Sequence, residues 1–277
     1  MIGIFINSRS GKGKAMQVSN IIANQLTSKA IPFVIYKDDW SLLTANITEA
    51  WIVGGDGTLN YFINKYPNIA IPLAIFKGGT GNDFSWKLYG DISTEEQIEK
   101  VLNATPQNVD AAMCNEKLFI NGVGIGFDGE VLKSMSAIRW LGGHLGYLLV
   151  VIKKIFTFKE FEFKIQSSQP HNQKFLIVNI ANSSRTGGGF HVSPLANVND
   201  GQLNVMLCKP LSIFKRLRYL PVIEKGKHLH LPFIHHHLTQ KITVQTQQKV
   251  FAQLDGELIE GSEFDIEVLK EKFQFRY

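Results

Sequence analysis

The most informative stretch of this chain is AWIVGGDGTLN, residues 50–60. Its apolar first half is typical of a buried strand, and glycines then open a segment with helical spacing. Open α/β sheets bind ligands beyond the carboxyl ends of their strands, where such a loop lies. Glycines let the backbone approach a phosphate, and the helix N-terminus adds positive potential. The loop therefore predicts a phosphate site, in which Asp56 could hold Mg²⁺ or a nucleotide hydroxyl, with an ordinary tight turn as the alternative.

Two further loops are expected at the same edge of the sheet. GGTGND, residues 78–83, and NSRSG, residues 7–11, each follow an apolar strand-like run. Because neighbouring parallel strands end at one sheet edge, the three loops are predicted to lie side by side. Gly11 and Gly13 each precede a lysine, but the spacing required of a P-loop is missing, so that motif is excluded.

The order of apolar segments predicts two domains. Residues 1–110 alternate strands (32–36, 50–53, 71–76) with helices (15–26, 59–66, 95–102), as in a doubly wound parallel α/β sheet. Residues 111–264 predict a β-rich domain with strands at 117–123, 161–166, 174–181, 203–208 and 241–246. Helical exceptions are expected at 131–158 and 212–220, and residues 265–277 are expected to return to the first domain.

Composition places the chain among ordered globular proteins. Its 277 residues are 44% hydrophobic and 19% charged, and include two cysteines without metal-ligand spacing. Too few for a disulfide framework, these cysteines predict a reducing, cytoplasmic location. A net charge of +5 suits anionic ligands or lipid surfaces and gives no reason to expect nucleic acid. No apolar run approaches the roughly 20 residues that span a bilayer, so membrane contact is expected to be peripheral, at the inner face.

A second glycine pattern is a decoy. Gly124, Gly126 and Gly129 satisfy GxGxxG after a strand-like run. A dinucleotide site would need an acidic ribose reader about 20 residues further on. Residues 131–159 contain no Asp or Glu, so nicotinamide or flavin binding is not expected.

Two acidic turns of the β-rich domain are candidates for chemistry. LDGE, residues 254–257, places Asp255 and Glu257 across a glycine, and either could take the proton of an attacking hydroxyl. A plain hairpin turn is the alternative, since Asp-Gly is a common turn dipeptide. At NDG, residues 199–201, Asp200 could bind Mg²⁺ together with backbone carbonyls, or simply cap a turn.

An ordered set of motifs now resembles a known family. NSRSGKGK, GGDGTLN, GGTGNDFS, NGVGIGFDGEV, LGYLLVVIKKI, GGGFHVSPLANVNDGQLNV and LDGE are similar to the soluble bacterial diacylglycerol kinases, which are related to sphingosine kinases. GGDGT alone is shared with NAD kinases and phosphofructokinases, whereas the ordered set is specific to lipid kinases. The resemblance implies a nucleotide-binding α/β domain, a β-sandwich domain and ATP in a cleft between them. It also implies transfer of the γ-phosphoryl group of ATP to a lipid hydroxyl, with diacylglycerol as the expected acceptor and phosphatidic acid as the product.

The resemblance assigns roles to individual residues. Glu257 would accept the proton of the lipid hydroxyl, with Asp255 as its close partner. Mg²⁺ would be held by Asp200, the backbone carbonyl of Gln202 and Asn197. The ATP site would be formed by Asn7, Ser10, Gly54, Gly55, Asp56, Gly57, Thr58, Leu59, Asn60 and Thr80.

The chain departs from the family pattern beside the nucleotide loops. Ser8 stands where the family has proline, and Ser85 and Trp86 stand where it usually has Ala-Arg. Tyr36 replaces a threonine that touches the nucleotide in many relatives, so that contact is not carried over. The acidic positions expected to act in catalysis are all present.

Two segments combine basic and apolar residues, 131–159 and 212–220. Such patterns are typical of helices on anionic membranes and equally of helices that face a core. We expect at least one of them to dock the enzyme, transiently, where its lipid substrate lies. The apolar residues concerned are Trp140, Leu141, Leu145, Tyr147, Leu148, Phe156 and Phe158 in the first segment, and Ile213, Phe214, Leu217 and Leu220 in the second.

Other functions stay open on the sequence alone. The acceptor could be a sphingoid base, phosphatidylglycerol or a soluble NAD-like substrate, and a catalytically silent nucleotide-binding regulator would share the first glycine loop. The retained Asp56, Asp255 and Glu257 argue against a silent protein. Sheet edges in the second domain could pair two copies into a homodimer.

Overall fold

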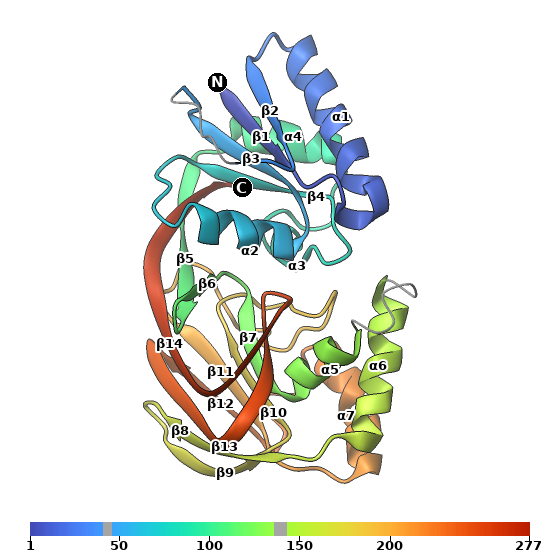
Figure 1. Cartoon of the computed structure of the whole chain (residues 1–277), viewed down its shortest axis with the longest axis vertical. Helices are drawn as coiled ribbons and strands as arrows, with labels where there is room; N and C mark the ends of the chain where they lie inside the picture. Colours follow the sequence, from blue (N-terminus) through green and yellow to red (C-terminus); the bar gives the residue numbers. More distant parts are fainter. Residues whose placement is uncertain (41–45, 136–142) are drawn as a thin grey trace. The chain divides into compact units, whose positions relative to one another are not determined.

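A computed structural model describes residues 1–40, 46–135 and 143–277 (Figure 1). The chain divides into two compact units, Met1–Val109 with Glu271–Tyr277, and Asp110–Lys270. The division expected from sequence has the same order of segments. The last strand, β14 (Glu257–Arg276), begins in the second unit and ends in the first.

The first unit is a parallel sheet with helices on both faces. Its strands follow the order β4–β3–β1–β2, and the end of β14 joins β4 in parallel through Phe275 and Leu73. Every residue of β1 is buried, as expected for a parallel strand covered on both faces. The strands are β1 (Ile2–Ile6), β2 (Phe33–Lys37), β3 (Glu49–Gly54) and β4 (Leu73–Lys77).

Helices α1 and α4 pack together on one face of this sheet, and α2 and α3 pack together on the other face (Figure 1). The bounds are α1 (Lys14–Ser28), α2 (Asp56–Lys65), α3 (Asp83–Tyr89) and α4 (Thr94–Asn103). A short 3-10 turn, η1 (Ser10–Gly13), precedes α1. At the start of α4, Glu96 N–H donates to Ser93 Oγ (3.1 Å) and Ser93 N–H donates to Glu96 Oε2 (2.9 Å), a capping box that fixes the first turn.

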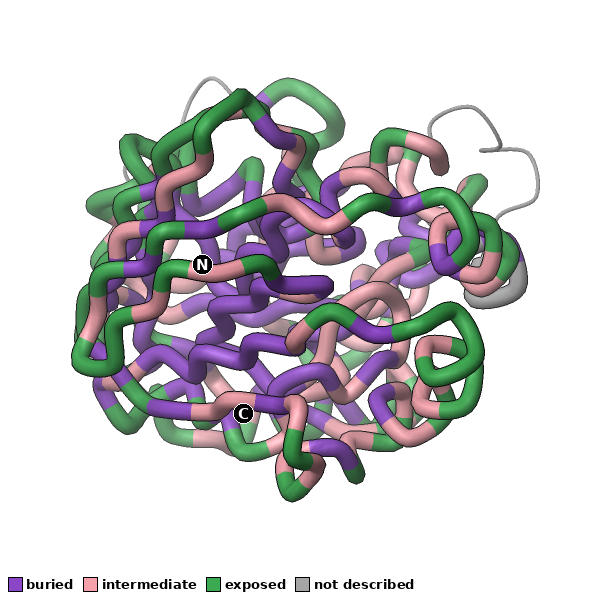
Figure 2. Tube along the Cα trace, turned by 90° about the horizontal axis from the view of Figure 1, so that it is seen from below, coloured by how far each residue is buried: buried purple, intermediate pink, exposed green. Residues whose placement is uncertain are grey.

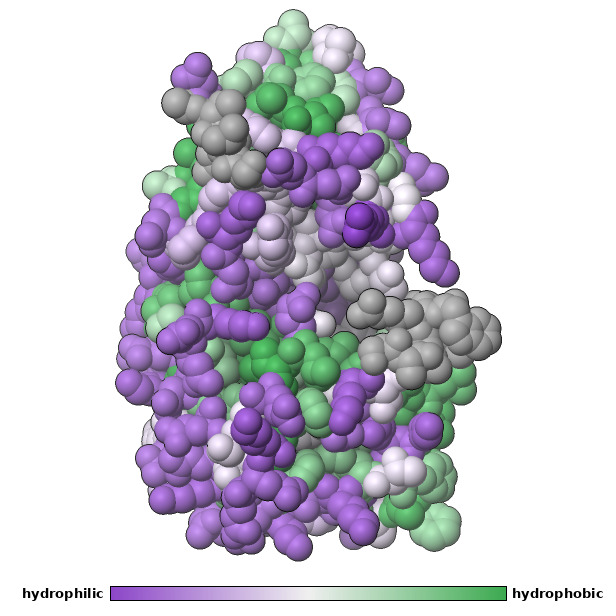
Figure 3. Space-filling view, in the orientation of Figure 1, coloured by the Kyte–Doolittle hydropathy of each residue, from purple (hydrophilic) through white to green (hydrophobic). Residues whose placement is uncertain are grey.

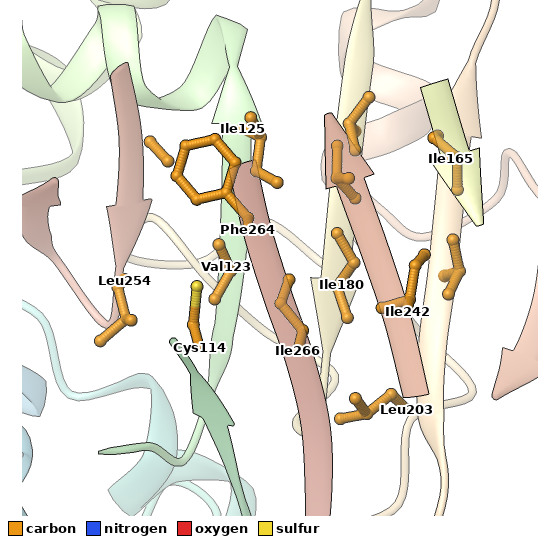
Figure 4. Packing of buried hydrophobic residues seen from close by; sticks show 14 of the residues in the cluster. Cys114, Val123, Ile125, Ile165, Ile180, Leu203, Ile242, Leu254, Phe264 and Ile266 are labelled. Carbon is orange, nitrogen blue, oxygen red and sulfur yellow. The ribbon is translucent and has the colours of Figure 1, made fainter. Parts of the chain in front are cut away.

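The second unit is an antiparallel β domain in the order β12–β11–β10–β7–β13–β14. Strand β13 pairs with β8 through Thr243–Thr246 and with β7 through Ala252–Leu254, so two parts of the sheet meet along one strand. Figure 4 shows apolar side chains from several of these strands packed between them. The strands are β5 (Pro106–Cys114), β6 (Lys117–Phe119), β7 (Gly122–Gly126), β8 (Phe161–Gln166), β9 (His171–Phe175), β10 (Ile177–Ala181), β11 (Leu203–Cys208), β12 (Ile234–Thr239) and β13 (Lys241–Leu254).

The predicted fold class, a doubly wound α/β domain followed by a β-sandwich domain, is confirmed. Two expected strands are each divided in the structure. The run 117–123 separates into β6 and β7 because the carboxylate of Asp255 takes the N–H groups of Ile120 and Asn121. The run 174–181 separates into β9 and β10 because β9 pairs with β8 whereas β10 pairs with β11 and β7.

The helices of the second unit are α5 (Phe127–Met135), α6 (Gly143–Thr157) and α7 (Ile213–Glu224). Their bounds overlap both expected helical segments, of which residues 136–142 lie outside the described ranges, and α6 packs on α5 and on α7 (Figure 1). Trp140 and Leu141, named above for membrane contact, lie outside the described residues, as do the side chains of Leu145 and Tyr147. Buried residues follow the strands of both units, and exposed residues gather in the connections (Figure 2). None of the helices within the described ranges is long and apolar enough to cross a membrane.

Candidate functional site

The three glycine loops of the first unit meet at the carboxyl ends of β1, β3 and β4. Gly11 has a φ of +60°, and a Cβ there would stand 2.4 Å from the carbonyl oxygen of Gly78. A Cβ on Gly79 would stand 2.4 Å from the Cα atom of Gly55. These contacts join backbone to backbone, so any side chain at these positions would push the loops apart. The prediction that the loops lie side by side is confirmed within this unit.

Asp56 ties two of these loops together. Its Oδ2 accepts a hydrogen bond from Asp83 N–H (2.9 Å), and its Oδ1 accepts one from Phe84 N–H (2.9 Å). The carboxylate therefore caps the N-terminus of α3, where anionic groups are favoured. The sequence suggested that Asp56 holds Mg²⁺ or a nucleotide hydroxyl. The structure adds a positioning role, because both carboxylate oxygens already hold backbone donors.

Asn7 links the loop at residues 7–11 to the loop at residues 54–58. Asn7 Nδ2 donates to Thr58 Oγ1 (3.2 Å), and Ser10 N–H donates to the carbonyl oxygen of Asn7 (3.0 Å). Thr58 is 5% exposed, and its side chain packs over Gly54, where a Cβ would meet it at 2.4 Å. The structure thus brings Asn7, Ser10, Gly54 and Thr58 together.

The remaining residues assigned to the nucleotide differ in accessibility. Leu59 is 0% exposed and Asn60 is 6% exposed, with Asn60 Oδ1 accepting from Asn64 Nδ2 (3.2 Å). The Leu59 side chain belongs to the core, so only its backbone could serve a ligand. Thr80 is exposed, and the amides of Thr80 and Gly81 donate to no atom in the described part of the chain. These two amides are the donors best suited to an added anion.

The departures from the family pattern have local structural reasons. Ser8 donates to Asp38 through its N–H (2.8 Å) and its Oγ (2.6 Å), which lowers the pKa of Asp38, whereas a proline would lack that N–H. Tyr36 stacks on Phe5, with ring centroids 4.7 Å apart. Ser85 Oγ donates to a backbone carbonyl of β4 (3.1 Å). These side chains therefore serve packing inside the first unit.

In the second unit, Asp255 and Gly256 form the two-residue turn between β13 and β14. Their φ angles are 47° and 88°, as in a type I′ hairpin. Asp255 is 4% exposed and accepts from the N–H groups of Ile120 (2.7 Å), Asn121 (2.9 Å) and Gly122 (2.9 Å). Residues 255 and 256 thus form a hairpin turn, and the Asp255 carboxylate additionally fixes the segment between β6 and β7.

Glu257 lies two residues further on and differs from Asp255 in its exposure and in its hydrogen bonding. It is exposed at the first position of β14, opposite Leu254. Its carboxylate makes no hydrogen bond or ion pair with the described residues. Of the two candidates for a base, Glu257 is the one whose oxygens are accessible.

The turn predicted to hold a metal is organised around a residue that the sequence did not single out. Asp110, 1% exposed, accepts from Gly201 N–H through Oδ2 (2.7 Å). Asp200 is exposed and accepts from Gln202 N–H through Oδ1 (2.9 Å), and Asn197 is exposed on the same loop. An isolated aspartate inside the apolar run VDAAM was the available signal for Asp110. Across the described ranges, no three His, Cys, Asp or Glu residues form a metal-binding group.

A second unexpected acid, Asp128, lines a pocket of the second unit. The pocket holds about 650 Å³ of empty space, part of it open to solvent, and most of its walls are apolar side chains of α5, α6, α7 and residues 176–192. Asp128 Oδ2 is buried and has no hydrogen-bond partner among the residues that the structure describes. Burial raises the pKa of Asp128 to about 6, and a hydrogen bond with Asn179 opposes this shift.

The GxGxxG glycines explain how Asp128 is accommodated. A Cβ on Gly124 would lie 2.1 Å from Asp128 Oδ2, and a Cβ on Gly129 would lie 2.2 Å from the backbone of Phe251. The glycines therefore let α5 press against β7 and β13. In this structure the pattern serves the packing of a helix on two strands, and the sequence did not single out the Asp128 carboxylate for which it makes room.

Known families match both parts of the chain. The diacylglycerol kinase catalytic domain matches residues 1–114, and the YegS C-terminal NAD kinase beta sandwich-like domain matches residues 121–273. A "Probable lipid kinase YegS-like" of Shewanella frigidimarina is 26% identical over 237 residues, 83% of this chain and 76% of the relative. A "Diacylglycerol kinase" of Mycobacterium tuberculosis is 24% identical over 243 residues, 81% of this chain and 78% of the relative.

Solved structures share the fold over the full length. A structure from Bacillus anthracis str. Sterne superposes with a TM-score of 0.81 at 25% identity, covering 100% of this chain and 94% of the other. Another from that organism, described as a diacylglycerol kinase, has a TM-score of 0.76 at 23% identity and covers 100% and 96% of the two chains. At 23% identity, the similarity to this second structure shows a shared fold and nothing further.

Proposed function

We propose a reaction for this chain from the premise that it belongs to the lipid kinase family of the diacylglycerol kinase catalytic domain and the YegS C-terminal domain. The reaction is transfer of the γ-phosphoryl group of ATP to the free hydroxyl of diacylglycerol, giving phosphatidic acid. Relatives named diacylglycerol kinase support this acceptor. The observation that carries the lipid character of the acceptor is the apolar pocket beside Asp128.

The donor side is supported by the converging loops of the first unit. The free amides of Thr80 and Gly81 and the N-terminus of α2 offer positive potential to a polyphosphate. Asp56 holds the loops in this arrangement through its bonds to α3. When bound, ATP supplies the phosphoryl group, and Mg²⁺ neutralises the charge that develops on it.

The turn at Asp200 fits a Mg²⁺ ion by its chemistry. Mg²⁺ prefers oxygen ligands, and the turn offers the second carboxylate oxygen of Asp200, the carbonyl of Gln202 and the amide oxygen of Asn197. We expect Mg²⁺ to raise the thermal midpoint of the free protein and Asp200→Asn to remove that increase. This role is structural, because it stabilises a loop wrapped around Asp110.

The proton of the acceptor hydroxyl requires a carboxylate with free lone pairs. Asp255 is excluded from that work by its three backbone donors, whereas the exposed Glu257 has none. Glu257 is therefore the proposed proton acceptor, and Asp255 holds the hairpin that carries it. General bases of this kind typically contribute a factor of about 10² to 10⁴ in rate.

The acceptor pocket accounts for a lipid in preference to a soluble alcohol. Most of the side chains that line it are apolar and suit acyl chains. Asp128 Oδ2 makes no hydrogen bond with the described residues, and the protonated carboxyl would donate one to an ester carbonyl of the acceptor, whose single free hydroxyl is left to Glu257. That bond would satisfy a polar atom which otherwise costs about 1–3 kcal/mol to leave unpaired.

The test is incubation with γ-labelled ATP and separate acceptors: diacylglycerol, sphingosine, phosphatidylglycerol and NAD. We expect label in phosphatidic acid. Asp128→Ala, which removes the hydrogen-bonding group, should raise KM for diacylglycerol about tenfold with KM for ATP unchanged, and Glu162→Ala, an exposed change on β8, serves as the control. Label found only in NAD, or in sphingosine but not phosphatidic acid, would overturn the proposed acceptor.

A further inference from the structure

The outer face of α7 presents apolar side chains to solvent. Phe214 is 86% exposed, Ile213 is 40% exposed and Leu217 is 37% exposed. Their spacing places them on one side of the helix, and the neighbouring helix α6 also has exposed apolar side chains, Leu149 and Phe156. Hydrophobic surface broken by hydrophilic side chains is visible at the lower right of Figure 3, where Figure 1 draws α6 and α7. Contiguous apolar surface rimmed by polar groups is typical of an interaction site.

The charge around this patch is positive. Residues 211–230 contain five Lys or Arg residues and one acid, Glu224. Lys215 and Arg218 are exposed on α7, and Lys225 and Lys227 are exposed just after it. The patch therefore matches an anionic partner rather than a neutral or basic one.

One of the five cations points inward and does not belong to this surface. Arg216 Nη1 donates to the carbonyls of Ile155 (3.0 Å) and Phe158 (3.1 Å), and its Nη2 pairs with Glu160. Arg216 lies in the basic and apolar segment 212–220 that was expected to dock on a membrane, but these contacts turn it away from that surface. Its bonds fix the start of α7 to the end of α6, so the exposed patch is held on a braced helix.

The inner face of α7 is a wall of the acceptor pocket. Tyr219, Leu220 and Ile223 line it together with Arg216. The sequence grouped Leu220 with the exposed apolar residues, but this side chain is half-buried and faces the pocket. The helix therefore separates the pocket from the solvent-facing patch.

We propose that the outer face of α7 docks on the surface of an anionic phospholipid bilayer. Phe214, Ile213 and Leu217 would enter the interface between headgroups and acyl chains, and Lys215 and Arg218 would contact anionic headgroups. A second copy of this chain is disfavoured as the occupant, because two such faces would bring like charges together. Docking would set the acceptor pocket beside the source of its lipid, a consequence that rests on the proposed function.

The test is sedimentation of the full chain with vesicles of phosphatidylcholine, alone or mixed with phosphatidylserine, without ATP. We expect at least about tenfold tighter binding to the anionic vesicles. Phe214→Ser with Leu217→Ser should weaken binding about tenfold or more, and Lys215→Glu with Arg218→Glu should remove the preference for anionic lipid. The matched controls are Leu195→Ser, at a side chain 65% exposed, and Lys249→Glu, both of which should bind like the unchanged protein.

A second measurement separates docking from catalysis. Phosphorylation of a short-chain diacylglycerol dispersed in water should be the same for the α7 variants as for the unchanged chain, because these four residues do not line the pocket. If the unchanged chain does not phosphorylate this diacylglycerol, the proposed acceptor is wrong. The vesicle experiment still tests membrane docking in that case, because it uses no ATP and no turnover. Equal vesicle binding by the α7 variants and the unchanged chain would overturn the docking face. So would a change in oligomeric state with Phe214→Ser, which would mean that the face joins two copies.

Discussion

Asp56 in the first unit and Asp255 in the second perform similar work in different surroundings. Each carboxylate follows a strand, beside a glycine, and takes backbone N–H groups from another segment. Asp56 binds two donors at a half-buried loop edge, whereas Asp255 binds three and is 4% exposed. A conspicuous acid in a glycine-rich motif can therefore be a structural anchor, with an accessible residue nearby left for the ligand. Thr80 is that neighbour in the first unit and Glu257 in the second.

The largest effect is expected for Asp255→Ala, which tests whether the Asp255 carboxylate anchors the hairpin. Three buried N–H groups would lose their acceptor, so we expect a loss on the order of 4 kcal/mol in the free energy of unfolding, measured in urea. Glu257→Ala, two residues away and exposed, should change stability by less than about 0.5 kcal/mol. A similar small effect at both positions would show that Asp255 does not anchor the hairpin.

Glu257→Gln tests the proposed role of the accessible acid in proton transfer. We expect kcat to fall about 100-fold or more, with nucleotide binding and stability retained, because the amide cannot take the proton of the hydroxyl. Glu260→Gln, an exposed change on the same strand, should leave kcat unaltered. Retained turnover in Glu257→Gln would remove this residue from its proposed role.

The second unit should lose stability in acid before the first, because all eight histidines lie in the second unit. Desolvation lowers the pKa of His171, His228, His235 and His236, and it lowers that of His237 to about 4. The unfolded chain then binds more protons below pH 6.5, so stability is present above that pH and falls as the pH drops toward about 4. Asp128, whose pKa is raised, acts in the opposite direction. We expect a net loss of about 2 kcal/mol.

The measurement uses the placement of tryptophan. In a Trp140→Phe background the remaining tryptophans, Trp40, Trp51 and Trp86, all lie in the first unit. Acid should alter the far-ultraviolet circular dichroism of the second unit before it alters tryptophan fluorescence. His237→Gln should shift the acid transition to lower pH. Coincident transitions at an unchanged pH would contradict this assignment.

The smallest effect is expected for Asp56→Asn. An amide retains one good acceptor for the two donors of α3, and the loop edge is partly open to water, so we expect a loss of about 1 kcal/mol in stability. Nucleotide affinity should fall with it, because the loops would be less firmly held. Glu95→Gln, an exposed change in the first turn of α4, is the control. Thermal unfolding and ATP titration measure both effects.

Much of the fold could be predicted because its signals are local. Apolar runs at residues 50–53 and 71–76 predict β3 and β4, and glycines just after them predict turns at one sheet edge. The expected strands 161–166 and 203–208 coincide with β8 and β11. Predictions failed at 117–123 and 174–181, where a hydrogen-bond partner distant in sequence divides the run.

The alternation of strands and helices, the meeting of the glycine loops and the family can be predicted from the amino-acid sequence, since they follow from periodicity and from motifs read in order. Which acids are anchors and which are accessible is visible only in the folded chain. Burial and hydrogen-bond partners depend on segments far apart in the chain: Asp255 meets residues 120–122, and Asp128 faces a pocket walled by α6 and α7. A carboxylate's chemistry is set by those distant neighbours through desolvation and donated N–H groups, and no local pattern records them.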